Sequence, residues 1–188
     1  MAYMGDEKFW DSLFEKRGDK QLQPEAALVK HIDLFQKGSV LDLACGDGRN
    51  TLYLLENGFD VTGIDFSQSG LDRLRQFGTI YGERLTLQQT DLSEDNCLKT
   101  LGKFNNILIC HYRVTKQNLR TLSDHLSENG ILFITGFGEG HVCDERIKAE
   151  DLIHQSDIEV LLETFDMIHE ERVKDDRGYF VTEVFGKM

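Results

Sequence analysis

The pattern of apolar and polar positions between Ser39 and Asp65 predicts a strand, a turn, a helix and a second strand. An apolar run over 40–44 stops at a glycine-containing turn, and apolar residues then recur every three to four positions. Gly58 is expected to close the helix, and a short apolar run follows it up to Asp65. This order is typical of a βαβ unit, whose glycine turn lies beside a ligand-binding crevice.

Two helices are predicted ahead of this unit. The second begins near Pro24, which suits the first turn of a helix, and its apolar stripe continues to Gly38. The first covers 6–17 and places four large apolar residues on one face: Phe9, Trp10, Leu13 and Phe14. Both helices are expected to pack over the sheet.

Strands and helices continue to alternate after Asp65. Ser67 is expected to cap a helix that ends at Gly78, and another helix is expected from Thr115 to about Ser127. Further strands are predicted over 84–88, 104–110 and 131–135. This alternation predicts a three-layer, doubly wound α/β fold, with helices on both faces of a mostly parallel sheet.

The end of the chain has a different pattern. A helix is expected over 158–164, followed by strands over 165–172 and 179–185 that a connection over 174–178 joins. An antiparallel hairpin would thus complete a seven-stranded sheet. We expect a single domain over 1–188, with N-terminal helices capping the site over 1–37, a cofactor-binding core over 38–136, and a helix plus hairpin over 137–188.

Composition narrows the possible partners. The net charge of −12 and the isoelectric point near 4.9 disfavour nucleic acid, whose binding normally needs a Lys/Arg stripe. No apolar run approaches the length of a membrane span, and the first ten residues lack the layout of a signal peptide. The four cysteines contain no C-x-x-C pair. We therefore expect a cytoplasmic protein with a small-molecule substrate, without nucleic-acid or membrane partners; its oligomeric state is open.

The glycine turn and three carboxylates carry the candidate chemistry. Gly46 and Gly48 let the backbone approach a ligand, but Thr51 stands where a dinucleotide fingerprint has its third glycine. Acids recur with successive strands: Asp42 lies in the first, Asp65 ends the second and Asp91 follows the third. Carboxylates can accept ribose hydroxyl protons and an exocyclic amine proton, so this arrangement favours a nucleoside ligand.

These motifs resemble those of the class I S-adenosylmethionine-dependent methyltransferases. The segment over 42–48 is similar to the family's glycine-rich first motif, Asp65 to its ribose acid, and Asp91 to its adenine-side acid. The turn is also similar to that of small tellurite-resistance-type methyltransferases. Two positions depart from the family pattern: Ala44 replaces a glycine, and Asn105 replaces an aspartate.

The resemblance implies a Rossmann-like methyltransferase fold that binds S-adenosyl-L-methionine and releases S-adenosyl-L-homocysteine. Carried over position by position, the candidate cofactor-binding residues are Asp42, Ala44, Cys45, Gly46, Gly48, Arg49, Asn50, Asp65, Phe66, Ser67, Asp91, Leu92 and Cys110. In similar methyltransferases the segment before the first strand folds over the cofactor. Here such a lid would involve Tyr3, Trp10 and the stretch 21–23.

The residues that follow the fourth and fifth strands are candidates for contact with the methyl acceptor. His111 is the first candidate for a general base, because its reference pKa lies near neutrality, and Tyr112 is the second. The candidate substrate residues are Trp10, His111, Arg113 and His141. Neither Cys110-His111 nor His141-x-Cys143 has a recognised zinc spacing, so no metal is expected.

Methyl transfer from a sulfonium is an in-line displacement, and it needs a base only when the nucleophile arrives protonated. The acceptor is open among thiols, amines, hydroxyls and metalloids. Three alternatives remain beside the small-molecule methyltransferase: an NAD(P)-dependent oxidoreductase, a non-catalytic nucleoside-binding module, and a nucleic-acid methyltransferase. The last lacks the Asn/Asp-Pro-Pro-aromatic motif after the fourth strand, where this chain has Cys-His-Tyr-Arg over 110–113.

Overall fold

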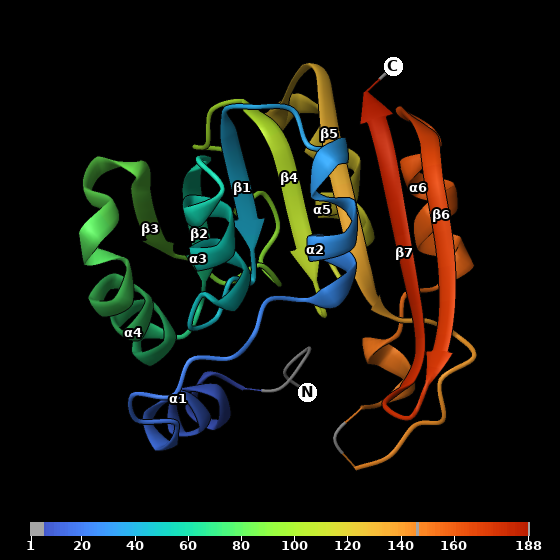
Figure 1. The fold of residues 1–188 in the computed structure, drawn as a ribbon. Coiled ribbons are helices and arrows are strands. Elements are labelled where there is room, and N and C mark those ends of the chain that lie inside the picture. Colours follow the sequence, from blue (N-terminus) through green and yellow to red (C-terminus); the bar gives the residue numbers. More distant parts are fainter. Residues whose placement is uncertain (1–5, 146, 188) are drawn as a thin grey trace.

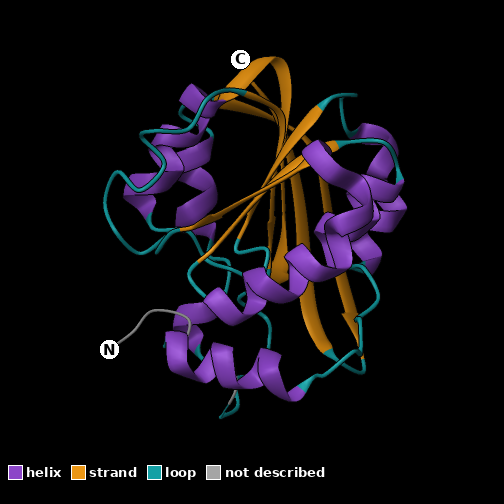
Figure 2. Cartoon of the chain, turned by 90° about the vertical axis from the view of Figure 1, so that its left-hand side faces the viewer, coloured by secondary structure: helices purple, strands orange, loops and turns teal. Residues whose placement is uncertain are grey.

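A seven-stranded sheet with helices on both faces forms the body of the protein (Figures 1 and 2). The computed structural model describes residues 6–145 and 147–187. The strand order across the sheet is β3-β2-β1-β4-β5-β7-β6. The strands are β1 (Ser39–Leu43), β2 (Asp60–Asp65), β3 (Leu85–Gln89), β4 (Phe104–Cys110), β5 (Leu126–Phe137), β6 (Phe165–Asp175) and β7 (Gly178–Lys187).

The first five strands pair in parallel, whereas β7 pairs antiparallel with both β5 and β6. The predicted doubly wound, mostly parallel sheet with a C-terminal hairpin is therefore confirmed. None of the helices in the described ranges is long and apolar enough to span a membrane.

Short helices cover the two faces of the sheet. They are α1 (Glu7–Lys16), α2 (Ala26–His31), α3 (Arg49–Glu56), α4 (Gln68–Gly78), α5 (Lys116–Thr121) and α6 (Gln155–Leu161). In Figure 1, α2 and α3 lie in front of the sheet, and α5 and α6 lie behind it. The helix α1 lies below the lower edge of the sheet, where the arrows of β1 and β4 end.

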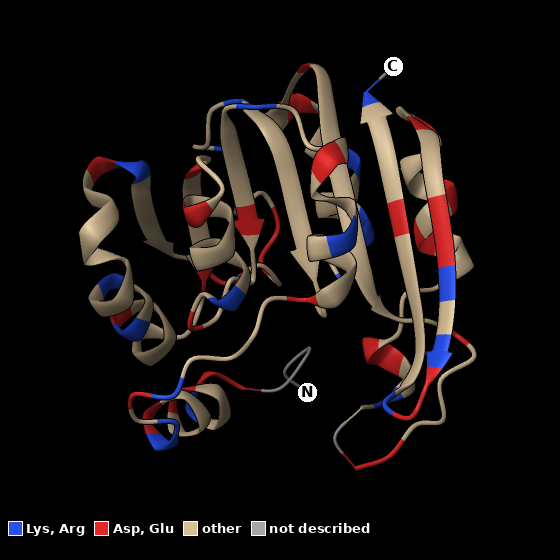
Figure 3. Cartoon of the chain, in the orientation of Figure 1, with Lys and Arg blue, Asp and Glu red and all other residues tan. Residues whose placement is uncertain are grey.

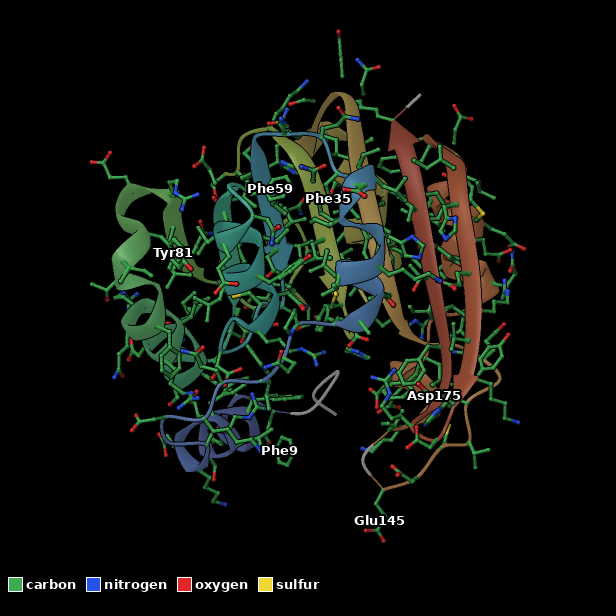
Figure 4. All side chains as sticks on the ribbon, viewed as in Figure 1. Phe9, Phe35, Phe59, Tyr81, Glu145 and Asp175 are labelled. Carbon is green, nitrogen blue, oxygen red and sulfur yellow. The ribbon has the colours of Figure 1, made fainter. Side chains whose placement is uncertain are left out.

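The core consists of two layers of apolar side chains, one on each face of the sheet. On the α2 side, the ring of Phe35 lies 6.1 Å from that of Phe59 and 5.5 Å from that of Phe133. Figure 4 labels Phe35 and Phe59 at the upper end of this layer. Because alternate strand residues face opposite layers, Leu108 belongs to this cluster while Ile107 and Ile109 belong to the other.

The direction of chain winding reverses beside β1. This strand pairs with β2 on one side and with β4 on the other, so the chain continues first toward β3 and then toward β6. Such a reversal leaves a crevice at the carboxyl ends of the strands, because the helices on either side of it diverge.

Several predicted element boundaries are wrong. The helix expected over 158–164 is α6 (Gln155–Leu161), and α2 ends at His31 instead of continuing to Gly38. The helix after Thr115 ends at Thr121; a 3-10 turn over Leu122–His125 follows, and Leu126 already pairs with Phe104. Strand pairing, which is a long-range interaction, overrides the local helical pattern there. The hairpin connection is also shorter than predicted, because β6 continues to Asp175 and β7 already begins at Gly178.

The edge strand β6 changes the direction of its side chains near its start. Met167 pairs with Phe185, but His169 pairs with Val184, so Ile168 is an extra residue between them. Phe185 faces the α6 side of the sheet and Val184 the α2 side. This β-bulge therefore turns His169, and Glu171 two residues later, toward the face that α2 covers.

Candidate active site

A cavity of about 260 Å³ lies at the carboxyl ends of the central strands, between the glycine turn and α1. It occupies the crevice at the reversal beside β1. Its lining consists of Trp10, Phe14, Arg17, Leu22, Ala44, Cys45, Gly46, Asp47, Arg49, Asn50, Asp65, Phe66, Thr90, Asp91, Leu92, Cys110, His111 and Tyr112. Most of the residues that the sequence nominated for cofactor binding thus meet in one place.

The glycine turn needs its glycines for two reasons. The backbone is left-handed at Ala44, Gly46 and Gly48, with φ values of 58°, 56° and 87°. A Cβ at Gly48 would also lie 2.2 Å from Cδ1 of Leu74 in α4. The turn can therefore bend tightly into α3, whose first N–H groups are directed toward the end of β1.

Two backbone hydrogen bonds fix the carboxylate of Asp65 in the cavity. Its Oδ2 accepts a hydrogen bond of 2.8 Å from the N–H of Gly46, and its Oδ1 accepts one of 2.9 Å from the N–H of Ser67. Burial raises the pKa of this carboxyl, which is 5% exposed. Each carboxylate oxygen can accept a further hydrogen bond, so the pair fits a vicinal diol such as that of a ribose.

Asp42 lies behind the cavity rather than in its lining. It is buried, and its Oδ2 accepts a 2.6 Å hydrogen bond from the hydroxyl of Thr51. Burial raises the pKa of Asp42 to about 7, although the Thr51 hydroxyl opposes the shift. Thr51, which replaces the third glycine of a dinucleotide fingerprint, thus anchors α3 to β1.

The third acid, Asp91, lies on the rim of the cavity beside Leu92. Its Oδ1 accepts hydrogen bonds of 2.8 Å and 2.6 Å from the backbone N–H and the hydroxyl of Ser93. The second oxygen remains available to accept from a ligand amine.

A second polar group lies at the end of β4. Nε2 of His111 lies 2.8 Å from Oε2 of Glu25, which immediately precedes α2. The Glu25 carboxylate also forms ion pairs with Arg49 at 3.2 Å and with Arg177 at 3.9 Å. The hydrogen bond with His111 is the main cause that lowers the pKa of Glu25 to about 2, so Glu25 is an anion at neutral pH.

The backbone and neighbouring rings hold His111 in place. Its φ is 54°, a left-handed value that is uncommon outside glycine, and its N–H donates to the carbonyl oxygen of Thr135. The imidazole ring lies 5.3 Å from the ring of Phe137 and 6.0 Å from that of Phe180. The side chain is therefore oriented before any ligand arrives.

The segment before β1 covers the cavity, as the sequence predicts for Trp10 and for Leu22 within the stretch 21–23. It is attached to α4 through Asp11, whose Oδ1 accepts from the hydroxyl of Ser67 at 2.5 Å and from the N–H of Ser69 at 3.1 Å. Arg17 forms a 2.7 Å ion pair with Asp47 of the glycine turn. Tyr3, the other predicted lid residue, lies outside the described residues.

Four nominated residues besides Asp42 are not part of the lining. Gly48 and Ser67 support the cavity as N-caps of α3 and α4. Arg113 forms hydrogen bonds of 2.8 Å and 3.0 Å with the carboxylate of Asp157, and it lines a separate small hollow beside α6. The ring of His141 lies 4.3 Å from that of Phe137, and its Nδ1 accepts from the N–H of Tyr179.

Ala44 and Asn105, the two residues that depart from the family pattern, lie at opposite ends of the central strands. Ala44 lies in the cavity lining. Oδ1 of Asn105 accepts a 2.9 Å hydrogen bond from the N–H of Ser39 at the other end of β1. Asn105 therefore joins β4 to β1 at the edge of the sheet opposite the cavity.

Sequence reasoning missed Glu25, the acid closest to His111. Glu25 lies beside Pro24 in a polar stretch, and no local pattern distinguishes it from a solvent-exposed glutamate. Phe14, Arg17 and Thr90 were also not nominated for the site, although they line the cavity. The apolar face of the first helix is the one sequence signal for Phe14, and it predicts a core contact without indicating the cavity.

Comparison with known proteins supports the family resemblance. A family model described as "Methyltransferase domain" matches residues 40–130. The putative methyltransferase YqeM of Bacillus subtilis is 29% identical over 191 residues, which covers 96% of this chain and 74% of that protein.

Solved methyltransferases have the same fold. TehB from Haemophilus influenzae superimposes with a TM-score of 0.72 at 17% identity, over 95% of this chain and 67% of that one. The 1,6-didemethyltoxoflavin-N1-methyltransferase of Burkholderia thailandensis, solved with 1,6-didemethyltoxoflavin and S-adenosylhomocysteine, has a TM-score of 0.70 at 21% identity, over 87% of this chain and 76% of that one.

Proposed function

We propose that the chain is a class I S-adenosylmethionine-dependent methyltransferase and that it methylates a hydroxyl or amino group of a small molecule; the methyltransferase-domain match over 40–130 and the shared fold support the first part. The observation that carries the proposal is the hydrogen-bonded pair of His111 and Glu25, which adjoins the same cavity as Asp65. An acceptor that arrives protonated needs a base, and this pair offers one.

The cavity residues fit the cofactor. Asp65, fixed by the N–H groups of Gly46 and Ser67, would accept from the ribose diol, and Asp91 would accept from the adenine amine. The bent backbone over 44–48 would leave room for the methionine portion. When bound, S-adenosylmethionine would supply an electrophilic methyl group on a positively charged sulfur.

His111 would serve as the general base. If Nε2–H donates to the Glu25 carboxylate, then Nδ1 holds the lone pair that can take a proton from the acceptor. The acceptor oxygen or nitrogen would form the bond to the methyl carbon as it loses that proton, while the bond from the methyl carbon to sulfur would break and S-adenosylhomocysteine would leave. The Glu25 anion would then stabilise the imidazolium, because the two groups are already in contact.

The covering residues would align the reactants and exclude water. Trp10 and Phe14 place aromatic rings over the turn, with Cζ of Phe14 3.0 Å from where a Cβ of Gly46 would stand. Good alignment contributes about 7–11 kcal/mol to the lowering of a barrier of this kind. We therefore infer that α1 contributes to catalysis by holding the cofactor and the acceptor in line.

The other interpretations have less support. YqeM is named a putative methyltransferase and the Burkholderia thailandensis protein a methyltransferase, and the Thr51–Asp42 hydrogen bond occupies the position of the third glycine that a dinucleotide site uses. The net charge of −12 supports a small acceptor over a nucleic acid. The buried, unpaired Cys45 and Cys110 suit a reducing compartment, which supports a cytoplasmic location.

Transfer of labelled methyl groups to a panel of acceptors would test this function. The panel contains phenols, aliphatic amines, thiols and oxyanions of tellurium and selenium. We expect product from hydroxyl or amine compounds at neutral pH. Product from thiols or metalloid oxyanions alone would contradict the proposal that the acceptor is a hydroxyl or an amine, and no product from any acceptor would contradict the catalytic proposal itself.

A further inference from the structure

Three side chains with metal-ligating atoms meet away from the cavity, where α2 faces the edge strand β6. They are His31 in the last turn of α2, and His169 and Glu171 of β6. One ligand atom from each of the three lies within 4.8 Å of the others. The imidazole rings of His31 and His169 are 4.5 Å apart, and Nε2 of His31 lies 2.9 Å from Oε2 of Glu171.

The β-bulge at Ile168 brings the two strand residues to this face. Beyond it, His169 pairs with Val184 and Glu171 with Thr182, so both follow the side of the sheet that packs under α2. Without the extra residue, both side chains would point to the opposite face, because strand residues alternate. The local backbone irregularity thus has a definite effect: it assembles the cluster.

His169 brings an unsatisfied ring nitrogen to the cluster. Its Nε2 is buried and has no hydrogen-bond partner among the residues that the structure describes. Leaving such an atom unpaired costs free energy, so these atoms are normally occupied by a partner. The neighbouring Glu171 contacts both Lys30 and His31 through its two carboxylate oxygens.

We propose that His31, His169 and Glu171 bind a divalent transition-metal ion of the zinc type. Two imidazole nitrogens and one carboxylate oxygen are a ligand set that zinc accepts, with water as the fourth ligand. Ligand atoms lie about 2.0–2.2 Å from zinc, so small rotations of the two rings would draw the three atoms together around the ion.

Lys30 is compatible with this arrangement. It donates to Oε1 of Glu171, whereas Oε2 is the oxygen next to His31. The carboxylate can thus bind the ion through Oε2 and keep Lys30 on Oε1, as hydrogen-bonded carboxylate ligands commonly do. In Figure 3 both acidic and basic residues colour the ribbon of β6, in keeping with this mixed surface.

The site connects the edge of the sheet to the active-site end of α2. His31 is at the carboxyl end of this six-residue helix, and Glu25, the partner of His111, is its N-cap. An ion that fixes His31 to β6 would therefore also restrict the movement of Glu25. The proposed ion stabilises structure and takes no part in methyl transfer.

Calorimetric titration of the chelator-treated full chain with Zn²⁺ tests the proposal. We expect one ion per chain, and a loss of affinity of roughly tenfold or more in His169→Ala and in Glu171→Gln. His154→Ala is the matched control, because His154 forms a 2.7 Å pair with Glu139 but belongs to no such three-residue cluster in the described chain. Its zinc affinity should equal that of the wild type.

A second measurement covers the case in which a variant is poorly folded. Long-range ¹H–¹⁵N spectra of the wild-type chain should show the ring nitrogens of His31 and His169 shifting on addition of Zn²⁺. Binding that is absent, that persists unchanged in both cluster variants, or that shifts the ring of His111 instead, would overturn the proposal. In each case the methyltransferase assignment would be unaffected.

Discussion

Nε2 of His111 and Oε2 of Glu25 lie 2.8 Å apart although the two residues are separated by 86 positions in the chain. This hydrogen bond joins the end of β4 to the start of α2, and Arg49 and Arg177 surround it. A methyltransferase whose acceptor is already an anion needs no general base. The His111–Glu25 pair is therefore the feature that most favours an acceptor that arrives protonated.

Replacing Glu25 by Gln should test that role. The amide retains a hydrogen-bond acceptor for His111 but removes the charge that stabilises an imidazolium. We expect kcat on a hydroxyl or amine acceptor to fall roughly ten- to a hundredfold, while the Kd for the cofactor stays within about twofold. Steady-state kinetics and calorimetry give the two values.

Glu25→Asp should recover part of the lost rate, because it restores the charge at a greater distance. Glu56→Gln, on the exposed side of α3, is the control and should match the wild type. If Glu25→Gln weakened cofactor binding and kcat alike, Glu25 would have a structural role only.

Asp65→Asn should abolish tight cofactor binding. The substitution removes the negative charge, and its amide hydrogens face the N–H donors of Gly46 or Ser67. A hydrogen bond to a charged group contributes about 1.5–3 kcal/mol, so we expect Kd to rise at least tenfold. Calorimetry with S-adenosylhomocysteine measures the effect.

Asp60→Asn, at the exposed start of the same strand, is the matched control for Asp65. Thermal unfolding of both variants separates loss of binding from loss of structure. An unchanged Kd in a folded Asp65→Asn protein would remove Asp65 from the site.

Gly48→Ala should destabilise the fold, because the added Cβ would clash with Leu74. Gly58→Ala is the control that measures the cost of the backbone conformation without such a clash. Both glycines are left-handed, with φ of 87° and 89°, but a Cβ at Gly58 meets nothing within 4 Å. Strain alone costs about 1 kcal/mol, and the contact with Leu74 at Gly48 adds about 1–3 kcal/mol. Tm should therefore fall by several degrees more in Gly48→Ala, and equal shifts would contradict the packing argument.

Glu183 should make the protein less stable as pH rises through neutrality. Burial raises the pKa of this carboxyl from 4.5 to about 7, and its Oε2 has no hydrogen-bond partner in the described chain. Between these two values the folded chain holds a proton that the unfolded chain has released. The contribution of Glu183 to stability is therefore fully present below about pH 4.5 and is lost as pH rises to about 7.

Glu183→Gln should remove this contribution, because the amide does not ionise. We expect the variant to gain on the order of 2 kcal/mol over the wild type at pH 8 and little at pH 4.5. Urea unfolding at the two pH values measures the difference. Glu159→Gln, on the exposed side of α6, should leave the pH dependence unchanged, and a Glu183→Gln profile parallel to the wild type would refute the prediction.

The sequence pattern alone predicts the parts of the site that lie within one βαβ unit, namely the glycine turn and Asp65. The turn over 45–48 follows a buried strand and opens a helix, so periodicity alone located it. Asp65 ends the next strand, and parallel strands bring their carboxyl ends together.

The remaining features depend on contacts between distant segments. Glu25 is part of the site because it contacts His111, and no periodic pattern in the sequence relates two residues that are 86 positions apart. The β-bulge at Ile168 depends on pairing with β7, so simple alternation assigns His169 and Glu171 to the wrong face. The early end of the helix after Thr115 has a similar cause, the pairing of Leu126 with Phe104.

The position of β7 between β5 and β6 has a consequence for the order in which a growing chain can assemble. The ribosome releases β6 first, yet the one neighbour of β6 in the described sheet is β7. The edge strand must therefore wait for β7 before it can dock, and Phe165, which is 1% exposed in the folded sheet, stays uncovered meanwhile. Arg177, in the turn between the two strands, reaches Glu25 at that same late step. Completion of the active site is thus delayed until β7 has been translated and has paired.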